Sequence, residues 1–133
     1  NFYDHARHSA FMISQAPLYG LTQIEQILTG FIAGFHHGIS RKILRAYRYD
    51  HMASAEDWVM IRKLSTILAL AEASDLTYEQ IVTDVDVTMA ENVAVVILST
   101  KPDSTYSAAD YEMKQLNKQF KKEFGASLLL VWR

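Results

Sequence analysis

The hydrophobic period of the chain changes once, near Thr77, and this change limits the fold more than any other feature. Before it, apolar residues recur every three or four positions, which is the period of an amphipathic helix. After it, residues 81–87 alternate apolar and polar side chains, and residues 93–98 form an apolar run rich in β-branched residues, as strands do. The sequence therefore predicts an α+β protein, with a helical domain over residues 1–78 and a small β-β-α-β domain over residues 79–133.

Breakers and caps divide the helical pattern into four segments. Pro17 closes the first segment, and Thr22 with Glu25 makes a capping box at the start of the second. A short third helix is expected over residues 40–49 and a long fourth one over residues 54–73. The apolar stripe expected on the second helix contains Ile24, Ile27, Leu28, Phe31, Ile32 and Phe35. The stripe expected on the fourth helix contains Trp58, Ile61, Leu64, Leu68 and Ala71. The chain begins within a helical pattern and without Met, so we expect it to be part of a longer protein.

The second domain is expected to contain three strands and one helix. Residues 89–92 can turn the chain between the first two strands. A helix is expected over residues 107–124, followed by Gly125 as a C-terminal cap. Residues 128–132 then form the third strand.

Composition excludes several classes of function. Half of the residues are hydrophobic and 21% are charged, as in a folded domain. The net charge of −2 shows no general basic character, so any phosphate binding requires a local patch, and no nucleic acid partner is expected. The apolar runs are shorter than a membrane span, so no membrane partner is expected. The absence of cysteine excludes disulfides and thiolate metal sites and fits a cytoplasmic protein.

Four histidines stand at spacings that allow metal binding. His5 and His8 share one face of the first helix, which is a common ligand spacing, although they can equally cap the helix, pair with Asp4 or lie at an interface. His36 and His37 end the second helix. Adjacent helical side chains diverge by about 100°, so these two do not easily bind one ion together. Imidazolium near the negative end of the helix dipole explains the pair equally well.

Charged residues supply two further candidates. Arg41, Arg45 and Arg48 recur at i, i+4 and i+7 beside Lys42, and so form a basic ridge on the third helix. Such a ridge suits an extended polyanion because each guanidinium can bind phosphate oxygens in bidentate fashion. A solvated surface face is the other interpretation. Glu72, near the end of the fourth helix, can be a metal ligand, a surface group or a cap of the next turn.

Several segments together resemble one family. Residues 5–13 resemble the His-x-x-His-Ser-x-x-x-Ile stretch that opens the helical third domain of exopolyphosphatase/guanosine-pentaphosphate phosphohydrolases. Residues 20–25 fit the family's turn and capped helix, and residues 35–37, Phe-His-His, stand where it has Tyr-His-Arg or Tyr-His-Lys. Residues 64–75 resemble its Leu-x-x-Leu-Leu-Arg-Leu-Ala-Asp-x-Leu-Asp segment, with Ala69 in place of the arginine. The resemblance covers the whole chain, including the strand-containing tail.

The helical domain of that family is similar to HD-type metal phosphohydrolases. The resemblance places His5 or His8 at the first histidine of the HD pattern and His36 at the histidine of its His-Asp pair. His37 and Glu72 then replace its two aspartates. Replacing aspartate by imidazole removes an anionic ligand that a hard cation needs. The resemblance therefore implies a domain that kept the fold and holds no metal.

The resemblance also implies a function. The chain would be the C-terminal accessory part of an exopolyphosphatase-like hydrolase of phosphoanhydride bonds. Catalysis and Mg²⁺ would belong to an N-terminal actin-like ATPase-fold region of the parent chain, so no catalytic residue and no cofactor is expected here. The accessory part would bind polyphosphate or guanosine pentaphosphate and form a homodimer. The predicted polyanion contacts are Arg41, Lys42, Arg45 and Arg48, with Arg7 and His37 in addition.

Two other interpretations stay open. In the first, the chain is a stand-alone HD-type metal-dependent phosphohydrolase acting on a nucleotide or alarmone, and a bound ion activates a water molecule. In the second, it is a dimerisation module without a ligand. The metal ligands of the first interpretation would be His5, His8, His36, His37 and Glu72.

Overall fold

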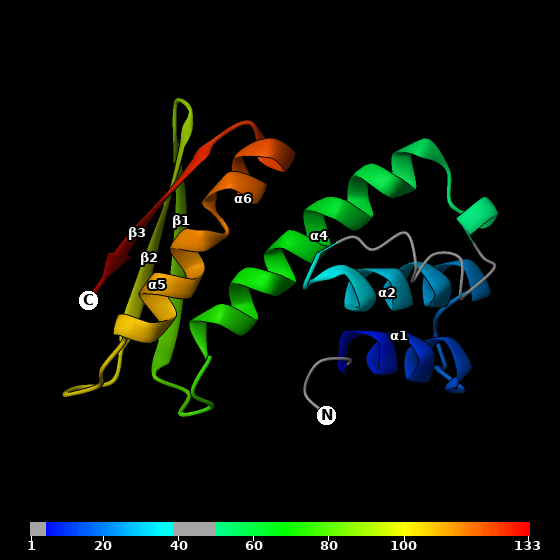
Figure 1. The fold of residues 1–133 in the computed structure, drawn as a ribbon, viewed down its shortest axis with the longest axis horizontal. Helices are drawn as coiled ribbons and strands as arrows, with labels where there is room; N and C mark the ends of the chain where they lie inside the picture. Colours follow the sequence, from blue (N-terminus) through cyan, green and yellow to red (C-terminus); the bar gives the residue numbers. More distant parts are fainter. Residues whose placement is uncertain (1–4, 39–49) are drawn as a thin grey trace. The chain divides into compact units, whose positions relative to one another are not determined.

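The computed structural model describes residues 5–38 and 50–133, so the helix predicted over residues 40–49 lies outside the described residues. Within them the predicted α+β class is confirmed, with five α-helices and one three-stranded mixed sheet (Figure 1). The chain divides into two compact units, Asn1–Leu68 and Ala69–Arg133. This division falls inside helix α4 (Ala55–Ser74), whereas the sequence predicted a boundary after residue 78.

The first unit contains helices α1 (His5–Gln15) and α2 (Gln23–Phe35), the short 3₁₀ helix η2 (Asp50–Met52) and the start of α4. The predicted capping box at α2 is confirmed. The Thr22 hydroxyl accepts a hydrogen bond from the backbone N–H of Glu25, and the Thr22 N–H donates to the Glu25 carboxylate at 2.7 Å. These bonds satisfy N–H groups that have no partner within the helix.

Aromatic side chains from two helices form the core of the first unit. Phe35 and Ile61 are fully buried, and the Phe31 ring stacks against both Phe35 and Trp58, which also contact each other. The ring centroids are 5.8 Å and 5.5 Å apart, within the range in which offset stacking is favourable. The apolar stripe predicted for α2 therefore does face the core, apart from Ile24, which is half exposed.

The buried face of α4 differs from the stripe that the sequence predicted. Ile61 is buried as predicted, but Leu64 and Leu68 are exposed. The buried positions that follow Ile61 are instead the polar residues Ser65 and Thr66. Their hydroxyls donate to backbone carbonyls, Ser65 to Ile32 of α2 and Thr66 to Arg62 of its own helix, so their burial leaves no hydroxyl without a partner.

The second unit is a sheet with helices over one face (Figure 1). Strands β1 (Val82–Ala90) and β2 (Val93–Thr100) form an antiparallel hairpin, and β3 (Ser127–Trp132) runs parallel to β2. Helices α5 (Ser107–Gln115) and α6 (Asn117–Phe124) connect β2 to β3 and pack on the β2 face. The buried residues of this face and of the helices over it are Ala94, Val96, Leu98, Ala109, Met113 and Phe120.

The single helix predicted over residues 107–124 is in fact two helices, because the chain tightens at Leu116. The Leu116 N–H donates to the carbonyl of Met113, only three residues earlier, which narrows the turn there. The next residue, Asn117, accepts a hydrogen bond from the N–H of Leu128 in β3, at 2.7 Å. Gly125 ends α6 with a left-handed φ of 71°, as the sequence predicted for a C-terminal cap.

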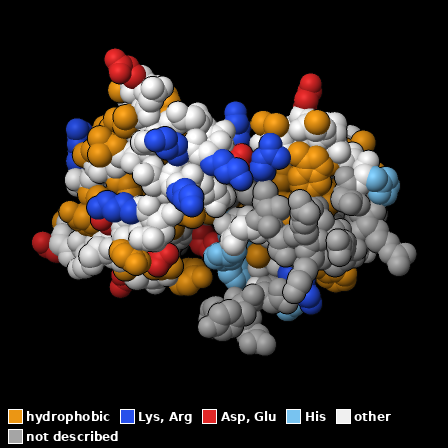
Figure 2. Space-filling view, turned by 45° about the horizontal axis from the view of Figure 1, so that its top comes forward, with side chains coloured by type: hydrophobic (Ala, Val, Ile, Leu, Met, Phe, Trp, Pro, Cys, Tyr) orange, Lys and Arg blue, Asp and Glu red, His pale blue; other side chains and the backbone are white. Residues whose placement is uncertain are grey.

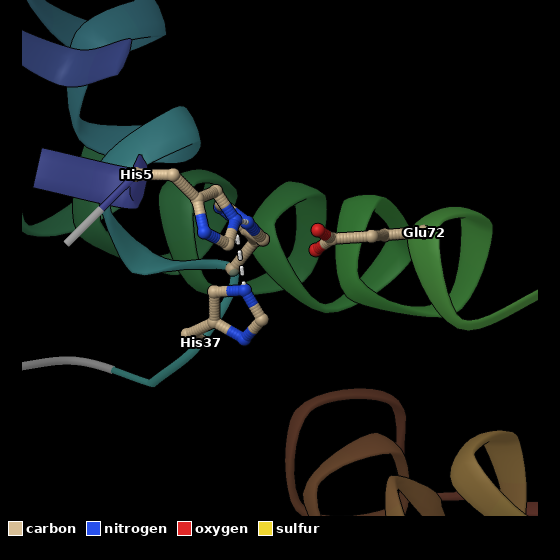
Figure 3. A group of neighbouring side chains, drawn as sticks. His5, His37 and Glu72 are labelled. Carbon is tan, nitrogen blue, oxygen red and sulfur yellow. Dashed lines mark hydrogen bonds between the residues drawn. The ribbon is translucent and has the colours of Figure 1, made fainter. Parts of the chain in front are cut away.

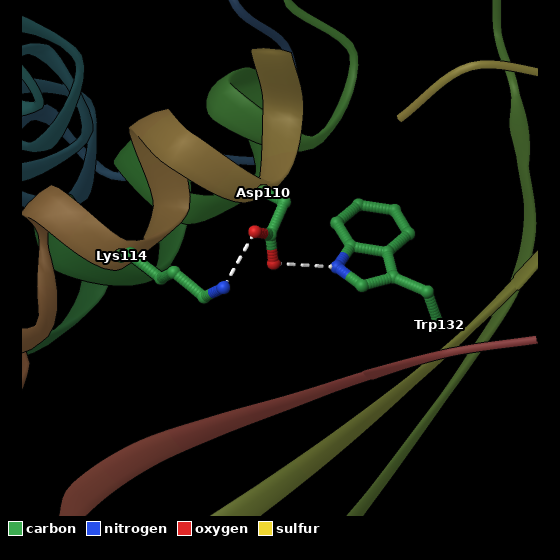
Figure 4. Close-up of polar contacts among 3 residues, drawn as sticks. All are labelled: Asp110, Lys114 and Trp132. Carbon is green, nitrogen blue, oxygen red and sulfur yellow. Dashed lines mark hydrogen bonds and ion pairs between the residues drawn. The ribbon is translucent and has the colours of Figure 1, made fainter. Parts of the chain in front are cut away.

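A carboxylate joins α5 to β3 in this unit. Asp110 accepts a hydrogen bond from the Lys114 ammonium one turn later and another from the Trp132 indole N–H, at 2.6 Å and 2.9 Å (Figure 4). The Lys114 hydrogen bond is the largest of the effects that hold the pKa of Asp110 below its ordinary value. The carboxylate is therefore stabilised in its charged form in the folded protein.

We expect the substitution Asp110→Asn to lower the free energy of unfolding at neutral pH and to have little effect in strongly acidic solution. Because the folded pKa of Asp110 lies below 3.8, its contribution is present above pH 3.8 and is lost as the pH falls through the folded value. Denaturant unfolding at a series of pH values measures the difference. Glu112→Gln, at an exposed position of the same helix, is the control. A difference that is independent of pH would contradict the argument.

Candidate metal centre

Two unusual residues of α2 bring it close to α1. A Cβ atom at Gly30 would lie 3.3 Å from the carbonyl oxygen of Ala10, so the two backbones are in near contact there. The Gln26 side-chain amide donates two hydrogen bonds of 2.7 Å, to the carbonyls of Ile13 and Ala16 at the end of α1. The sequence interpretation did not assign a role to either residue. An isolated glycine and a glutamine within an apolar helix were the available signals.

This packing places His5 beside the residues that follow α2. His5 is the first residue of α1, and its Nε2 atom lies 3.1 Å from Nε2 of His36 and 3.0 Å from Nε2 of His37. The ring centroids of His36 and His37 are 4.3 Å apart. Figure 3 shows the imidazoles of His5 and His37 facing each other. The Nε2 atoms of His36 and His37 thus both lie next to the Nε2 atom of His5.

The hydrogen bond of His36 to the backbone determines which of its nitrogens faces His5 with a lone pair. Nδ1 of His36 bonds to the carbonyl oxygen of Ala33 in the last turn of α2. Because a carbonyl only accepts, this nitrogen carries the hydrogen. In the neutral imidazole, Nε2 then carries a lone pair directed toward His5. Metal-binding histidines generally have such a backbone partner on the other nitrogen.

The expectation that the side chains of His36 and His37 point apart is wrong, although the two residues differ in burial. His36 is 7% exposed and His37 is exposed to solvent. Both nevertheless reach Nε2 of His5. The reason is that α2 ends at Phe35 and His36 is its C-cap, so His37 lies beyond the helix. The helical rotation of about 100° per residue therefore does not separate these side chains.

The candidate ligands named from the sequence are largely brought together. Within the first unit, one ligand atom each of His5, His36 and His37 lies within 4.8 Å of the others. Glu72 belongs to the part of α4 that lies in the second unit. His8, by contrast, is exposed on α1 and is not in this group. Imidazole nitrogens suit Zn²⁺, Fe²⁺ or Co²⁺, whereas Mg²⁺ prefers oxygen ligands, so the group does not fit Mg²⁺.

Some of the predicted polyanion contacts lie within the described residues and others lie outside them. The basic ridge of Arg41, Lys42, Arg45 and Arg48 lies outside the described residues. Arg7 is exposed on α1. On the face seen in Figure 2, lysine and arginine side chains are interspersed with apolar and uncharged ones.

No family model matches the chain, and no curated protein matches it. Among residues 5–38 and 50–133, none of the helices combines the length and the apolar character that a membrane span requires.

We expect Gly30→Val to lower the free energy of unfolding by about 1–3 kcal/mol, because the added methyl groups meet the α1 backbone at Ala10. Denaturant unfolding followed by circular dichroism measures the loss. Gln23→Val, at an exposed position of the same helix, controls for the helix propensity of valine. Equal losses of unfolding free energy in the two variants would mean that the close approach of α1 and α2 does not restrict the size of the side chain at position 30.

Proposed function

We propose that the chain is the C-terminal accessory part of an exopolyphosphatase-like phosphohydrolase, an HD-like helical domain followed by a small domain. In this proposal it binds polyphosphate or guanosine pentaphosphate and forms a homodimer, while catalysis with Mg²⁺ belongs to an N-terminal region of the parent chain. One observation carries the proposal. Histidines that the resemblance aligned with the HD pattern come from two separate segments of the first unit, and one ligand atom each of His5, His36 and His37 lies within 4.8 Å of the others.

This observation supports the resemblance because the alignment used sequence order alone. His5 and the pair His36 and His37 are separated by 30 residues or more along the chain. An alignment that had matched unrelated helices would give no reason for these positions to converge. The convergence therefore favours a helical arrangement of the HD type.

Polyphosphate binding rests on the basic ridge. The protein has a net charge of −2, so a local group of cations is needed to hold a polyanion. Arg41, Arg45 and Arg48 recur along one helical face by their spacing in the sequence. Each arginine that binds a phosphate releases condensed counterions, so binding should weaken as salt rises.

We expect the triple substitution Arg41→Ala, Arg45→Ala and Arg48→Ala to weaken binding of long-chain polyphosphate and to reduce its dependence on salt. Loss of three phosphate contacts should reduce the slope of log K against log salt by about 2. Titration at several salt concentrations measures both. The control replaces three exposed lysines of α6 with alanine and so changes the net charge equally; these are Lys118, Lys121 and Lys122.

The two triple variants separate the possible outcomes. A selective loss in the arginine variant supports the ridge as the binding site. Equal losses in both variants would mean that only the overall charge matters, and an unchanged affinity in the arginine variant would contradict the proposal.

A second function is favoured by the chemistry of the ligand group. The three imidazoles of His5, His36 and His37 could hold an ion that activates a water molecule, as in a stand-alone metal-dependent phosphohydrolase acting on a nucleotide or alarmone. If so, protein loaded with Zn²⁺ or Fe²⁺ should release phosphate from a nucleotide, and His36→Ala should abolish the release. His51→Ala, which changes an exposed histidine outside the group, is the control. Release that persists in the His36 variant would exclude this function.

A further inference from the structure

We infer that His5, His36 and His37 bind one transition-metal ion of the Zn²⁺ type through their Nε2 atoms, and that this ion fastens the start of α1 to the end of α2. The inference goes beyond the proposed polyphosphate binding, and it shares its ion with the second function but assigns that ion a structural role. It requires neither polyphosphate binding nor hydrolysis, because the ion would act by joining two helices of the first unit.

The distances between the nitrogens are close to those around a single ion. Imidazole nitrogens lie about 2.0–2.1 Å from Zn²⁺, so two of them at a tetrahedral angle are about 3.3 Å apart. The Nε2 atom of His5 lies 3.1 Å and 3.0 Å from those of His36 and His37. A small outward movement of the three rings would therefore admit the ion without a change of backbone.

Hydrogen atoms alone do not account for both of these contacts. Nε2 of His5 carries at most one hydrogen, which can be donated fully to one of its two neighbours. Nε2 of His36 presents a lone pair, because its Nδ1 donates to the Ala33 carbonyl. A cation at the centre accepts the lone pairs of all three nitrogens at once. The same Ala33 contact would hold the His36 ring in the orientation needed for binding.

The kind of ion follows from the donors. Three neutral nitrogens favour Zn²⁺, Co²⁺ or Ni²⁺ over Mg²⁺ and Ca²⁺, which prefer oxygen. Three protein ligands leave the fourth position of a tetrahedral ion for an oxygen donor. This differs from the domain without metal that the family resemblance implied, because the imidazole that replaces an aspartate at position 37 contributes a donor of its own.

The position of the site suggests a structural role. His5 lies in the first turn of α1, and His36 and His37 follow the last residue of α2. The helices already meet at Gly30, opposite the middle of α1, and at Gln26, near its other end. An ion bound to the histidines would join the two helices at a second point, and binding to the folded state alone would raise the thermal stability.

The experiment uses the whole chain, freed of metal with a chelator and kept free of polyphosphate and nucleotides. We expect Zn²⁺ to bind with one ion per chain and to raise the unfolding temperature, and Co²⁺ to give the intense visible absorption of a four-coordinate site. His5→Ala, His36→Ala and His37→Ala should each weaken binding by more than the roughly 10–100-fold that loss of an outer partner costs. His8→Ala and His51→Ala, which change the two remaining histidines, should bind as the unsubstituted protein does.

Because His37 is exposed, the His37→Ala variant can test the inference even if the His36→Ala variant does not fold. His36 is buried, so its replacement can disturb folding, whereas replacing His37 opens no buried space. Unchanged Zn²⁺ affinity in a folded His37→Ala variant would overturn the inference. So would an equal loss in His8→Ala, or competition by equimolar Mg²⁺. These measurements contain no polyphosphate, so their failure would leave the polyphosphate titration unaffected.

Discussion

The close contact between α1 and α2 is the constraint on which the candidate site depends. Gly30 lets the helix backbones approach, and the Gln26 amide holds the last turn of α1 through two of its carbonyls. The Gln26 contacts lie near one end of α1, and His5 begins the other end. Because an α-helix is stiff over three turns, fixing one end of α1 also limits where His5 can lie.

The end of α2 contributes the second part of the arrangement. A helix end leaves carbonyl groups without partners, and His36 uses one of them to fix its own ring. The chain leaves the helix after Phe35, which frees His37 to turn toward the same point. His36 can therefore stabilise the helix C-terminus and act as a ligand at the same time. Its Nδ1 atom bonds to the helix, and its Nε2 atom is the one that would bind the ion.

The second unit is stabilised in a different way. Its helices cover the β2 face, where Val96 and Leu98 are buried, while β1 has only β2 as a neighbour among the described strands. Val85 and Val87 of β1 lie opposite Leu98 and Val96 in the register, yet both remain at least half exposed. Helices α5 and α6 thus cover the central strand β2 and leave the edge strand β1 largely uncovered.

The sequence by itself determined the order of elements, because hydrophobic period, caps and breakers act over a few residues. Thr22 with Glu25 and Gly125 were predicted correctly for this reason. It did not reveal the break at Leu116, which involves a hydrogen bond between Asn117 and the distant β3. Nor did it reveal that Ser65 and Thr66, rather than the leucines, are buried on α4. The sequence named His5, His8, His36, His37 and Glu72 as candidates, but only the tertiary structure of the first unit separated His5 from His8 and brought His36 and His37 to one point. That choice depends on how α1 packs on α2 and where α2 ends, and such contacts between distant residues leave no periodic signal in the chain.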